Sequence, residues 1–205
     1  MLLTDKITGL PLWHKVIKRL TDVLIALTAL LFLSPLILFV AIMVFFTSNG
    51  PVMYSQERVG YKGKLFRILK FRSMFKNAEI SGPMLSGHHD LRITPWGRIM
   101  RRWKLDELPQ LWNVLAGEMS IVGPRPERLF YIRKMEEQTH LYGPLLEVKP
   151  GITSLGMVKY GYAGNVEEMI ERMKYDLIYL EKNSLKLDFK IMLSTFRIVF
   201  MAKGR

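Results

Sequence analysis

Two adjacent carboxylates, Asp106 and Glu107, follow a short basic run that contains Arg101, Arg102 and Lys104. An ionised carboxylate among guanidinium and ammonium groups is suited to attack a phosphorus atom, because the cations offset the charge on the phosphoryl oxygens. A neighbouring carboxylate is suited to hold Mg²⁺, which usually binds one or two carboxylates together with substrate phosphates. The pattern indicates phosphoryl transfer, with Asp106 as the nucleophile and both carboxylates as candidate metal ligands.

Other reaction classes lack their characteristic residues. The chain has no cysteine, which excludes a disulfide framework, a zinc ribbon, an iron–sulfur cluster and a thiol nucleophile. Its four histidines do not have the H-E-x-x-H spacing of a helical zinc site. The pair His88-His89 has no acidic or cysteine companion at ligand spacing, so we interpret both as loop residues.

The carboxylates stand at the start of a predicted helix. Leu108, Leu111 and Leu115 follow helical spacing, and the pattern ends at Gly117. Asp106 then falls at or beside the N-cap, where the helix dipole and neighbouring cations favour the ionised carboxylate. A helix cap without any chemistry remains an alternative, because Asp is a common capping residue.

Positive charge is concentrated before this helix. The chain carries 30 Lys and Arg against 18 Asp and Glu, and residues 56–105 alone hold 12 basic and 3 acidic side chains. Such a block predicts a polyanionic partner, which means nucleic acid, an anionic membrane or phosphorylated small molecules. Composition does not choose among these three.

An uncharged apolar run extends from Val23 to Phe46. As a helix its ~24 residues would extend about 36 Å, enough to cross a hydrocarbon core. Pro35 interrupts it, because proline has no N–H for the carbonyl of Leu31, and the Ser34 hydroxyl can bind a freed backbone group. Basic residues flank both ends of the run, which disfavours crossing. A re-entrant helix broken at Ser34-Pro35 and a kinked spanning helix both remain open on these grounds.

The remaining elements are short. Residues 51–56 and 64–71 have β-type patterns around a turn-like GYKG, which predicts a β-hairpin. Residues 81–95 have loop composition, residues 121–126 a rigid turn, and residues 149–164 an irregular glycine-rich pattern. Helices are predicted over 166–182 and from Ser184 onward, the last with an apolar face that suits either a membrane interface or the core.

Several motifs together resemble one family, the bacterial sugar transferases, which are monotopic phosphoglycosyl transferases. The resemblance covers about residues 13–200, and the chain looks like the small form of the family. The motifs are Ser34-Pro35, Gln56-Glu57-Arg58-Val59-Gly60, residues 66–74 (FRILKFRSM), residues 105–111 (LDELPQL), Asn113-Val114-Leu115 and residues 119–126 (MSIVGPRP).

The resemblance implies transfer of a sugar-1-phosphate from a UDP-sugar to a membrane polyprenyl phosphate, with release of UMP. This reaction initiates capsule, O-antigen, exopolysaccharide or glycoprotein glycan synthesis, through a covalent phosphosugar on Asp106 and with Mg²⁺ as cofactor. Glu107 is implied as the metal-side partner. The implied phosphate-binding residues are Lys70, Arg72, Arg101, Arg125 and Arg58.

The resemblance also implies where the protein lies and how it is built. We expect a monotopic protein on the cytoplasmic face of the bacterial inner membrane, in contact with its lipids, with a homo-oligomer as one option for its assembly. The expected fold is α+β and mainly helical, with a re-entrant membrane hairpin over 1–48 and a catalytic domain over 49–205. This domain should contain a short β-hairpin and interfacial amphipathic helices.

Two features qualify the resemblance. Ser154 and residues 157–161 (MVKYG) depart from the family's usual pattern, so the identity of the donor sugar is not inferred from better-known members.

A nucleic-acid binder is disfavoured because the basic block lacks interleaved aromatics and known binding signatures. A non-catalytic scaffold is disfavoured by the intact Asp106-Glu107 pair with Lys70 and Arg101.

Overall fold

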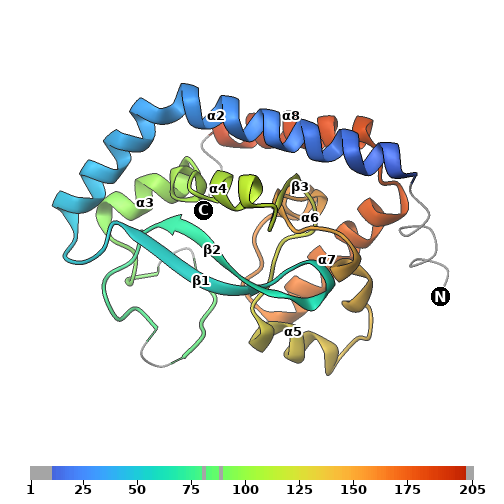
Figure 1. Ribbon diagram of the computed structural model, residues 1–205. Helices are drawn as coiled ribbons and strands as arrows, with labels where there is room; N and C mark the ends of the chain where they lie inside the picture. The colour runs from blue at the N-terminus through green and yellow to red at the C-terminus, as the bar shows by residue number, and fades with distance from the viewer. Residues whose placement is uncertain (1–10, 80–81, 88–89, 202–205) are drawn as a thin grey trace.

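The computed structural model describes residues 11–79, 82–87 and 90–201, so His88 and His89 lie outside the described residues. Helices predominate, and the strands form two separate pairs (Figure 1). In chain order the elements are α2 (Leu12–Thr47), β1 (Met53–Val59), η1 (Tyr61–Gly63), β2 (Leu65–Phe71), α3 (Pro95–Arg102), η2 (Leu105–Glu107), α4 (Gln110–Ala116), β3 (Ser120–Val122), α5 (Leu129–Glu136), η3 (Gly143–Glu147), β4 (Gly151–Thr153), α6 (Leu155–Lys159), α7 (Val166–Glu181) and α8 (Leu185–Phe200).

Helix α2 is continuous through Pro35 and is bent (Figure 1). Pro35 cannot donate to the carbonyl of Leu31, and the Ser34 hydroxyl donates to that oxygen instead at 2.8 Å. The role predicted for Ser34 is confirmed. The two arms form one bent helix, and a return of the second arm to the side of entry stays a prediction.

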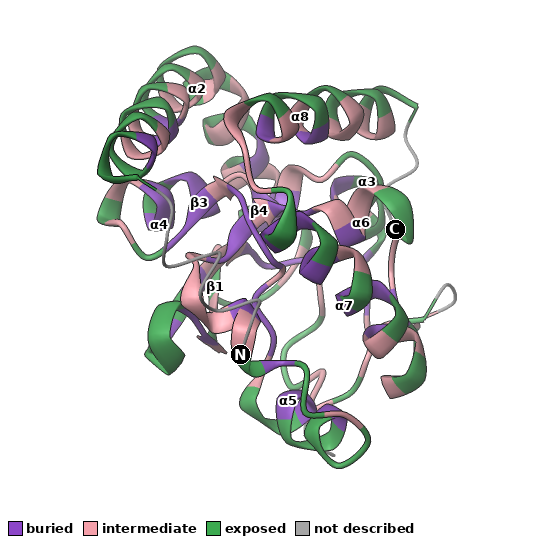
Figure 2. Cartoon of the chain, turned by 90° about the vertical axis from the view of Figure 1, so that its right-hand side faces the viewer, coloured by how far each residue is buried: buried purple, intermediate pink, exposed green. Residues whose placement is uncertain are grey.

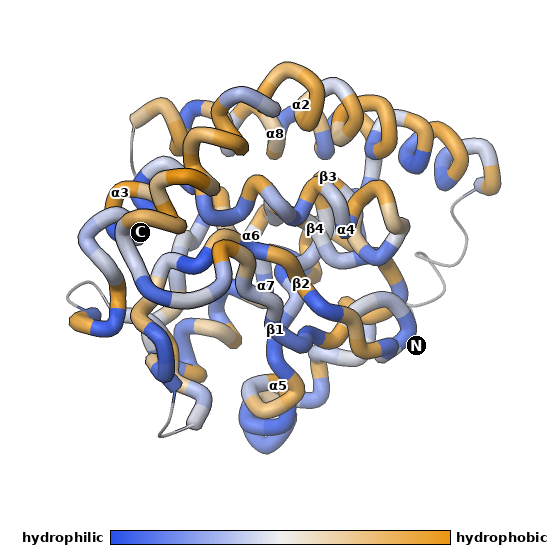
Figure 3. The backbone as a smooth tube through the Cα atoms, turned by 60° about the vertical axis from the view of Figure 1, so that its left-hand side comes forward, coloured by the Kyte–Doolittle hydropathy of each residue, from blue (hydrophilic) through white to orange (hydrophobic). Residues whose placement is uncertain are grey.

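Helix α2 covers two hydrophobic clusters of the globular part. Ala26 on the first arm packs in a cluster with Phe66 and Met119, and Val40 on the second arm packs in another with Met100. The opposite face of the helix exposes large apolar side chains along its length. Figure 3 shows this run of hydrophobic residues, with hydrophilic turns near the N-terminal end. Among the described residues α2 is the one helix long and apolar enough to cross a membrane.

Charged residues near the start of α2 bind the rest of the protein. Lys18 Nζ lies 2.7 Å from Asp188 Oδ2, and Arg19 donates to two carbonyl oxygens in the last turn of α4 at 2.6 and 2.9 Å. Asp22 accepts from the backbone N–H of Ile121 at 3.0 Å. Lys18 and Arg19, which belong to the basic flank of the apolar run, are therefore both held by acceptors of the globular part. Lys15 is exposed.

The predicted β-hairpin is confirmed as the antiparallel pair β1–β2, which η1 connects. Asn113 of α4 joins it to the helical layer, since its side-chain oxygen accepts from Leu69 N at 3.0 Å and its nitrogen donates to Arg67 O at 2.8 Å. Gly117 ends α4 with φ +84°, as its position after the apolar stripe predicted.

A second pair, β3–β4, is parallel and was not predicted. Ser120 pairs with Gly151 and Val122 with Thr153. A side chain at Gly123 or Gly151 would overlap the backbone of the neighbouring segment, so these glycines permit the close approach. The interpretation of residues 149–164 as irregular was also incomplete, since this stretch contains β4 and the short helix α6.

The predicted C-terminal helices are confirmed as α7 and α8, and the side chains of Asn165 and Ser184 cap their N-termini. Ile191 of α8 is buried, whereas Phe189, Leu193, Phe196 and Phe200 are exposed. Figure 2 shows α8 beside α2, with exposed residues along both helices. Of the two interpretations of this amphipathic helix, the exposed apolar face agrees with the interfacial one.

Candidate active site

The two carboxylates lie on the 3-10 turn η2, between α3 and α4. Lys104 precedes the turn in the left-handed conformation, with φ +58°, and Asp106 and Glu107 are both buried. Helix α4 begins at Gln110 after Pro109, so the placement of Asp106 at its N-cap was wrong. Proline has no N–H and its ring crowds the preceding turn, which accounts for a separate 3-10 turn before the helix.

Glu107 is surrounded by three cations. Its Oε1 lies 2.7 Å from Lys70 Nζ and 3.4 Å from Arg125 Nη2, and its Oε2 lies 3.6 Å from Lys104 Nζ. Burial favours the neutral acid, but the charges of Lys104, Lys70 and Arg125 outweigh it and hold the pKa of Glu107 well below its usual value. Glu107 is therefore ionised and fixes the positions of these cations.

Asp106 is in a different electrostatic state. No hydrogen bond or ion pair joins it to another described residue, and it lines a cavity. Burial and the charge of Glu107 raise the pKa of Asp106, and Lys70 and Arg101 offset this only in part. The prediction that the surroundings favour the ionised form of Asp106 was thus wrong, since desolvation outweighs the cations.

The cavity beside the two carboxylates has a volume of about 660 Å³. Residues from β1, β2, α3, η2, α5 and α7 line it, together with the loop segments that follow β2 and precede α5 and α7. All seven polar residues predicted for the site line this cavity: Arg58, Lys70, Arg72, Arg101, Asp106, Glu107 and Arg125. The structure thus brings together groups that are up to 67 positions apart in the sequence.

Arg101 reaches the cavity from α3. Its Nε donates to Ser73 Oγ at 2.9 Å and its Nη1 to Ser86 Oγ at 3.1 Å. Both of these partners are neutral hydroxyls. No ion pair joins the Arg101 guanidinium to a described carboxylate, so no such pair offsets its positive charge. Gly97 lets α3 approach this closely, because a Cβ there would overlap the Ser73 carbonyl.

An aromatic ring that sequence reasoning missed lies beside the cations. The ammonium of Lys104 lies 4.5 Å from the centroid of the Tyr162 ring, and the guanidinium of Arg125 lies 5.9 Å from it. These are cation–π distances, so the ring contributes to holding both side chains. Tyr162 follows the segment that departs from the family pattern, which is why no motif pointed to it.

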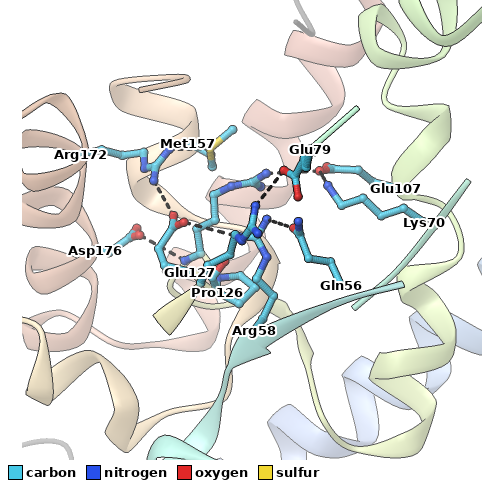
Figure 4. Close-up of polar contacts among 12 residues, drawn as sticks. Gln56, Arg58, Lys70, Glu79, Glu107, Pro126, Glu127, Met157, Arg172 and Asp176 are labelled. Carbon is cyan, nitrogen blue, oxygen red and sulfur yellow. Dashed lines mark hydrogen bonds and ion pairs between the residues drawn. The ribbon is translucent and has the colours of Figure 1, made fainter. Parts of the chain in front are cut away.

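Arg58 belongs to a second group of charges in the same cavity (Figure 4). It lies 3.3 Å from Glu127 Oε2 through Nη1 and donates to Gln56 Oε1 at 2.6 Å through Nη2. Glu127 also binds Arg172 of α7 at 2.5 Å. Sequence reasoning missed Glu127 and Arg172. The position of Glu127 directly after Pro124-Arg125-Pro126 was the one available signal.

Arg72 is bound to the end of α2. Its Nη2 donates to the backbone oxygen of Ser48 at 2.6 Å and to the Ser48 hydroxyl at 2.8 Å, and Nε donates to the same hydroxyl at 3.2 Å. Gly50 packs against its Nη1, where a Cβ would overlap. Arg72 therefore connects the membrane-type helix to the end of β2.

The residues that depart from the family pattern are not part of the cavity lining. Ser154 caps α6 by accepting from Met157 N at 3.0 Å. Tyr162 and Ala163, which come after the departing residues, line the cavity, and residues 157–161 do not. The departures thus lie behind the cavity wall.

The carboxylates predicted to hold a metal are the adjacent pair Asp106 and Glu107. Within the described ranges no group of three or more His, Cys, Asp or Glu is placed to hold an ion. Both oxygens of Glu107 face cations, whereas Asp106 has no such partner among the described residues. The protein offers Mg²⁺ one or two carboxylates, so phosphate oxygens would have to complete the coordination.

The sequence model described as bacterial sugar transferase matches residues 13–202. The chain belongs to the bacterial sugar transferase family. The match includes α2 as well as the whole cavity lining, so the helix and the cavity are parts of one family unit in this sugar transferase.

Named relatives share much of the sequence of this sugar transferase. The UDP-N-acetylgalactosamine-undecaprenyl-phosphate N-acetylgalactosaminephosphotransferase of Aeromonas hydrophila is 38% identical over 188 residues, which are 92% of this chain and 44% of that protein. The UDP-glucose:undecaprenyl-phosphate glucose-1-phosphate transferase of Klebsiella pneumoniae is 36% identical over 213 residues, covering 98% and 46%. The chain therefore spans less than half the length of these two relatives.

A relative of similar length also matches this sugar transferase. The exopolysaccharide production protein ExoY of Sinorhizobium fredii is 35% identical over 206 residues, which cover 91% of this chain and 87% of that protein. The matched region therefore makes up most of this relative.

Proposed function

We propose that this protein is a phosphoglycosyl transferase that moves a sugar-1-phosphate from a UDP-sugar to a membrane polyprenyl phosphate. The products are UMP and a polyprenyl-diphosphate sugar, the first lipid-linked intermediate of a cell-surface glycan. The observation that carries the proposal is the arrangement of Asp106, which faces the cavity beside a carboxylate that holds three cations. The names of the relatives, which specify UDP-sugars and undecaprenyl phosphate, support the substrate classes.

The reaction proceeds in two displacements at one phosphorus atom. An oxygen of Asp106 attacks the phosphorus that bears the sugar, the bond from that phosphorus to the bridging oxygen breaks, and UMP leaves with that oxygen. An oxygen of the polyprenyl phosphate then attacks the same phosphorus, and the bond to Asp106 breaks. The carboxylate is regenerated, and the sugar phosphate ends in a diphosphate linkage to the lipid.

The cations around Glu107 stabilise charge on the phosphoryl oxygens. Lys70 and Arg125 are held at one oxygen of Glu107 and Lys104 near the other, so their positions are fixed before a substrate arrives. Arg101 approaches from the other wall with no carboxylate partner among the described residues. Because burial raises the pKa of Asp106, its carboxylate is more basic than a solvated one and a stronger nucleophile once ionised.

Mg²⁺ fits this donor set with Asp106 as its first protein ligand. Phosphate oxygens of the donor would complete the coordination. Glu107 would join the coordination only if one of its cations moved, because both of its oxygens face cations. The ion, when bound, supplies Lewis-acid charge stabilisation at the phosphoryl group.

The exposed apolar faces of α2 and α8 suit a membrane surface. Exposed large side chains continue along α2 from Leu12 to Phe46 and along α8 from Phe189 to Phe200. The first arm of α2 is bound to α4 and α8 through Arg19 and Lys18, so it cannot cross a bilayer independently of the globular part. We therefore place the protein as a re-entrant, monotopic protein on the cytoplasmic face of the inner membrane.

The decisive experiment separates the two displacements. Purified protein mixed with Mg²⁺ and a UDP-sugar, without acceptor, should release at most one UMP per protein and carry a phosphosugar on Asp106 detectable by mass spectrometry. The donor is found first with a panel of UDP-hexoses and UDP-N-acetylhexosamines, because the relatives' names specify different sugars. Lipid product that forms only when both substrates are present, with no adduct on Asp106, would contradict the covalent route.

A further inference from the structure

One wall of the cavity is formed by an ion pair that the proposed reaction does not use. Arg128 Nη1 lies 2.8 Å from Glu79 Oε1, and both side chains line the cavity and are about one fifth to one quarter exposed, at 19% and 28%. The pair joins the segment after β2 to the residue that precedes α5. An exposed pair at a concave wall contributes little to stability, but it offers a donor and an acceptor to a ligand.

Neighbouring side chains extend this hydrogen-bonding wall. Arg58 donates to Gln56 Oε1 at 2.6 Å, and Gln56 Nε2 donates to the Tyr54 hydroxyl at 3.0 Å. These contacts fix the orientation of the Gln56 amide. Figure 4 shows Gln56, Arg58 and Glu79 in one view with Lys70 and Glu107, and all five residues line the cavity. The wall therefore presents oriented polar groups rather than a flat apolar platform.

The wall begins one side chain away from the phosphate-binding cations. Arg58 lies within electrostatic range of both Arg125 and Arg128. Arg125 in turn contacts Glu107, which follows Asp106 in the chain. Asp106, Arg125 and the Glu79–Arg128 pair line one cavity, so a donor whose phosphate lies beside Asp106 has this pair within the same cavity.

We propose that the Glu79–Arg128 pair binds the hydroxyl or acetamido groups of the donor's sugar ring and that these two residues determine sugar specificity. This inference rests on the proposed function. The sugar is bonded to the phosphorus that Asp106 attacks, whereas the nucleoside is one phosphate further away. A carboxylate oxygen and a guanidinium N–H at 2.8 Å match neighbouring ring substituents, one of which donates while the other accepts.

The test compares donors that differ at a single ring carbon. For wild type, Glu79→Gln and Arg128→Met, kcat/KM is measured with UDP-glucose, UDP-galactose and the corresponding UDP-N-acetylhexosamines, and the inhibition constant of UMP is measured alongside. We expect kcat/KM for the preferred donor to fall by about tenfold or more and to change far less for the poor donors, because a missing polar partner penalises the substrate that used it. Inhibition by UMP should stay unchanged.

A matched control is the Glu171→Gln variant, which breaks an exposed ion pair with Lys174 on α7 away from the cavity lining. It should leave every donor ratio unchanged. The doubly substituted variant Glu79→Arg with Arg128→Glu retains an ion pair in reversed order. It should keep a melting temperature close to that of the wild type and still lack the wild-type donor preference.

Three results would overturn the assignment. An equal loss of kcat/KM for all donors with weakened UMP inhibition would place the nucleoside at this wall. Unchanged donor ratios in both single variants, or full recovery of the preference in the reversed pair, would show a structural role. Absence of UMP release by the wild type from every UDP-sugar would instead refute the proposed function itself.

Discussion

Lys70 Nζ lies 2.7 Å from Glu107 Oε1, whereas Asp106, one residue earlier on the same 3-10 turn, has no ion-pair partner among the described residues. The two carboxylates therefore differ in electrostatic state although they are adjacent. Glu107 holds the cations in place, and Asp106 faces the cavity with a raised pKa. This difference gives the two residues separable effects on activity and stability.

Replacing Asp106 by Asn should abolish UMP release, with a loss of about 10³-fold or more because the nucleophile is removed. The melting temperature should stay the same or rise, since the substitution removes a carboxylate whose ionised form is disfavoured by burial. Membrane association should be unchanged. Full activity of Asp106→Asn would exclude this residue as the nucleophile.

Replacing Lys70 by Met should lower both activity and stability. Glu107 would keep Arg125 and Lys104 but lose its shortest contact, a charge-assisted hydrogen bond worth about 2 kcal/mol. Thermal unfolding in detergent checks the stability, and UMP release checks the activity. Adding Glu107→Gln to Lys70→Met should cost less than the sum of the two single changes, because the residues interact directly.

Replacing Lys18 by Met should destabilise the protein by about 2–3 kcal/mol, because it leaves the buried Asp188 without its cation. Asp188 would keep the hydrogen bond from the Tyr179 hydroxyl. The exposed Lys15→Met serves as the matched control and should have no measurable effect. Equal melting temperatures for the two variants would show that the Lys18–Asp188 contact does not hold α2 to α8.

Stability should depend on pH through Asp176. Burial raises the pKa of Asp176 to about 6, although the backbone N–H groups of Gly156 and Arg125 donate to it. Between the ordinary value of 3.8 and about 6, the folded protein retains a proton that the unfolded chain has released. The free energy of unfolding contributed by this group therefore falls as pH rises through that window, by about 3 kcal/mol.

The Asp176→Asn variant isolates this contribution. The melting temperature of the wild type should fall relative to that of the variant as pH rises from 4 to 6. The difference between the two should stay constant above about 7. A difference that is independent of pH would show that Asp176 titrates normally in the folded protein.

The re-entrant arrangement predicts that both ends of α2 face the cytoplasm. Single cysteines at Thr8 and Asn49 provide the test, because the chain has no natural cysteine. Asn49 is chosen over Ser48 because Arg72 binds Ser48. A membrane-impermeant thiol reagent applied from the periplasmic side should label neither site in intact cells. Labelling of either one would show a spanning helix.

Local patterns predicted much of the fold. The β1–β2 hairpin, the end of α4 at Gly117, and the helices α7 and α8 follow from short-range periodicity and turn residues. The pair β3–β4 was missed because its strands of three residues each contain no alternation that a sequence can show. Their pairing depends on a close backbone approach at Gly123 and Gly151.

The sequence predicted which residues belong to the site, but it did not predict the direction of the Asp106 pKa shift. Charge clustering and the family resemblance pointed to the seven polar residues that line the cavity. The direction of the Asp106 pKa shift was wrong because it depends on burial, which the sequence does not show. Glu127, Arg172 and Tyr162 were missed since each acts through a partner distant in the chain.

Helix α2 supplies side chains to the interior as well as to the exposed apolar surface. Ala26, Val40 and Val44 are completely buried against the globular part. Two arginines join the helix to this part: Arg19 binds a carbonyl 95 positions later in the chain, and Arg72 binds Ser48, 24 positions earlier. Removing residues 1–48 to obtain a water-soluble enzyme would therefore strip the cover from Met100 and Met119. Detergent or lipid nanodiscs, with the helix left in place, are the appropriate conditions for handling this protein.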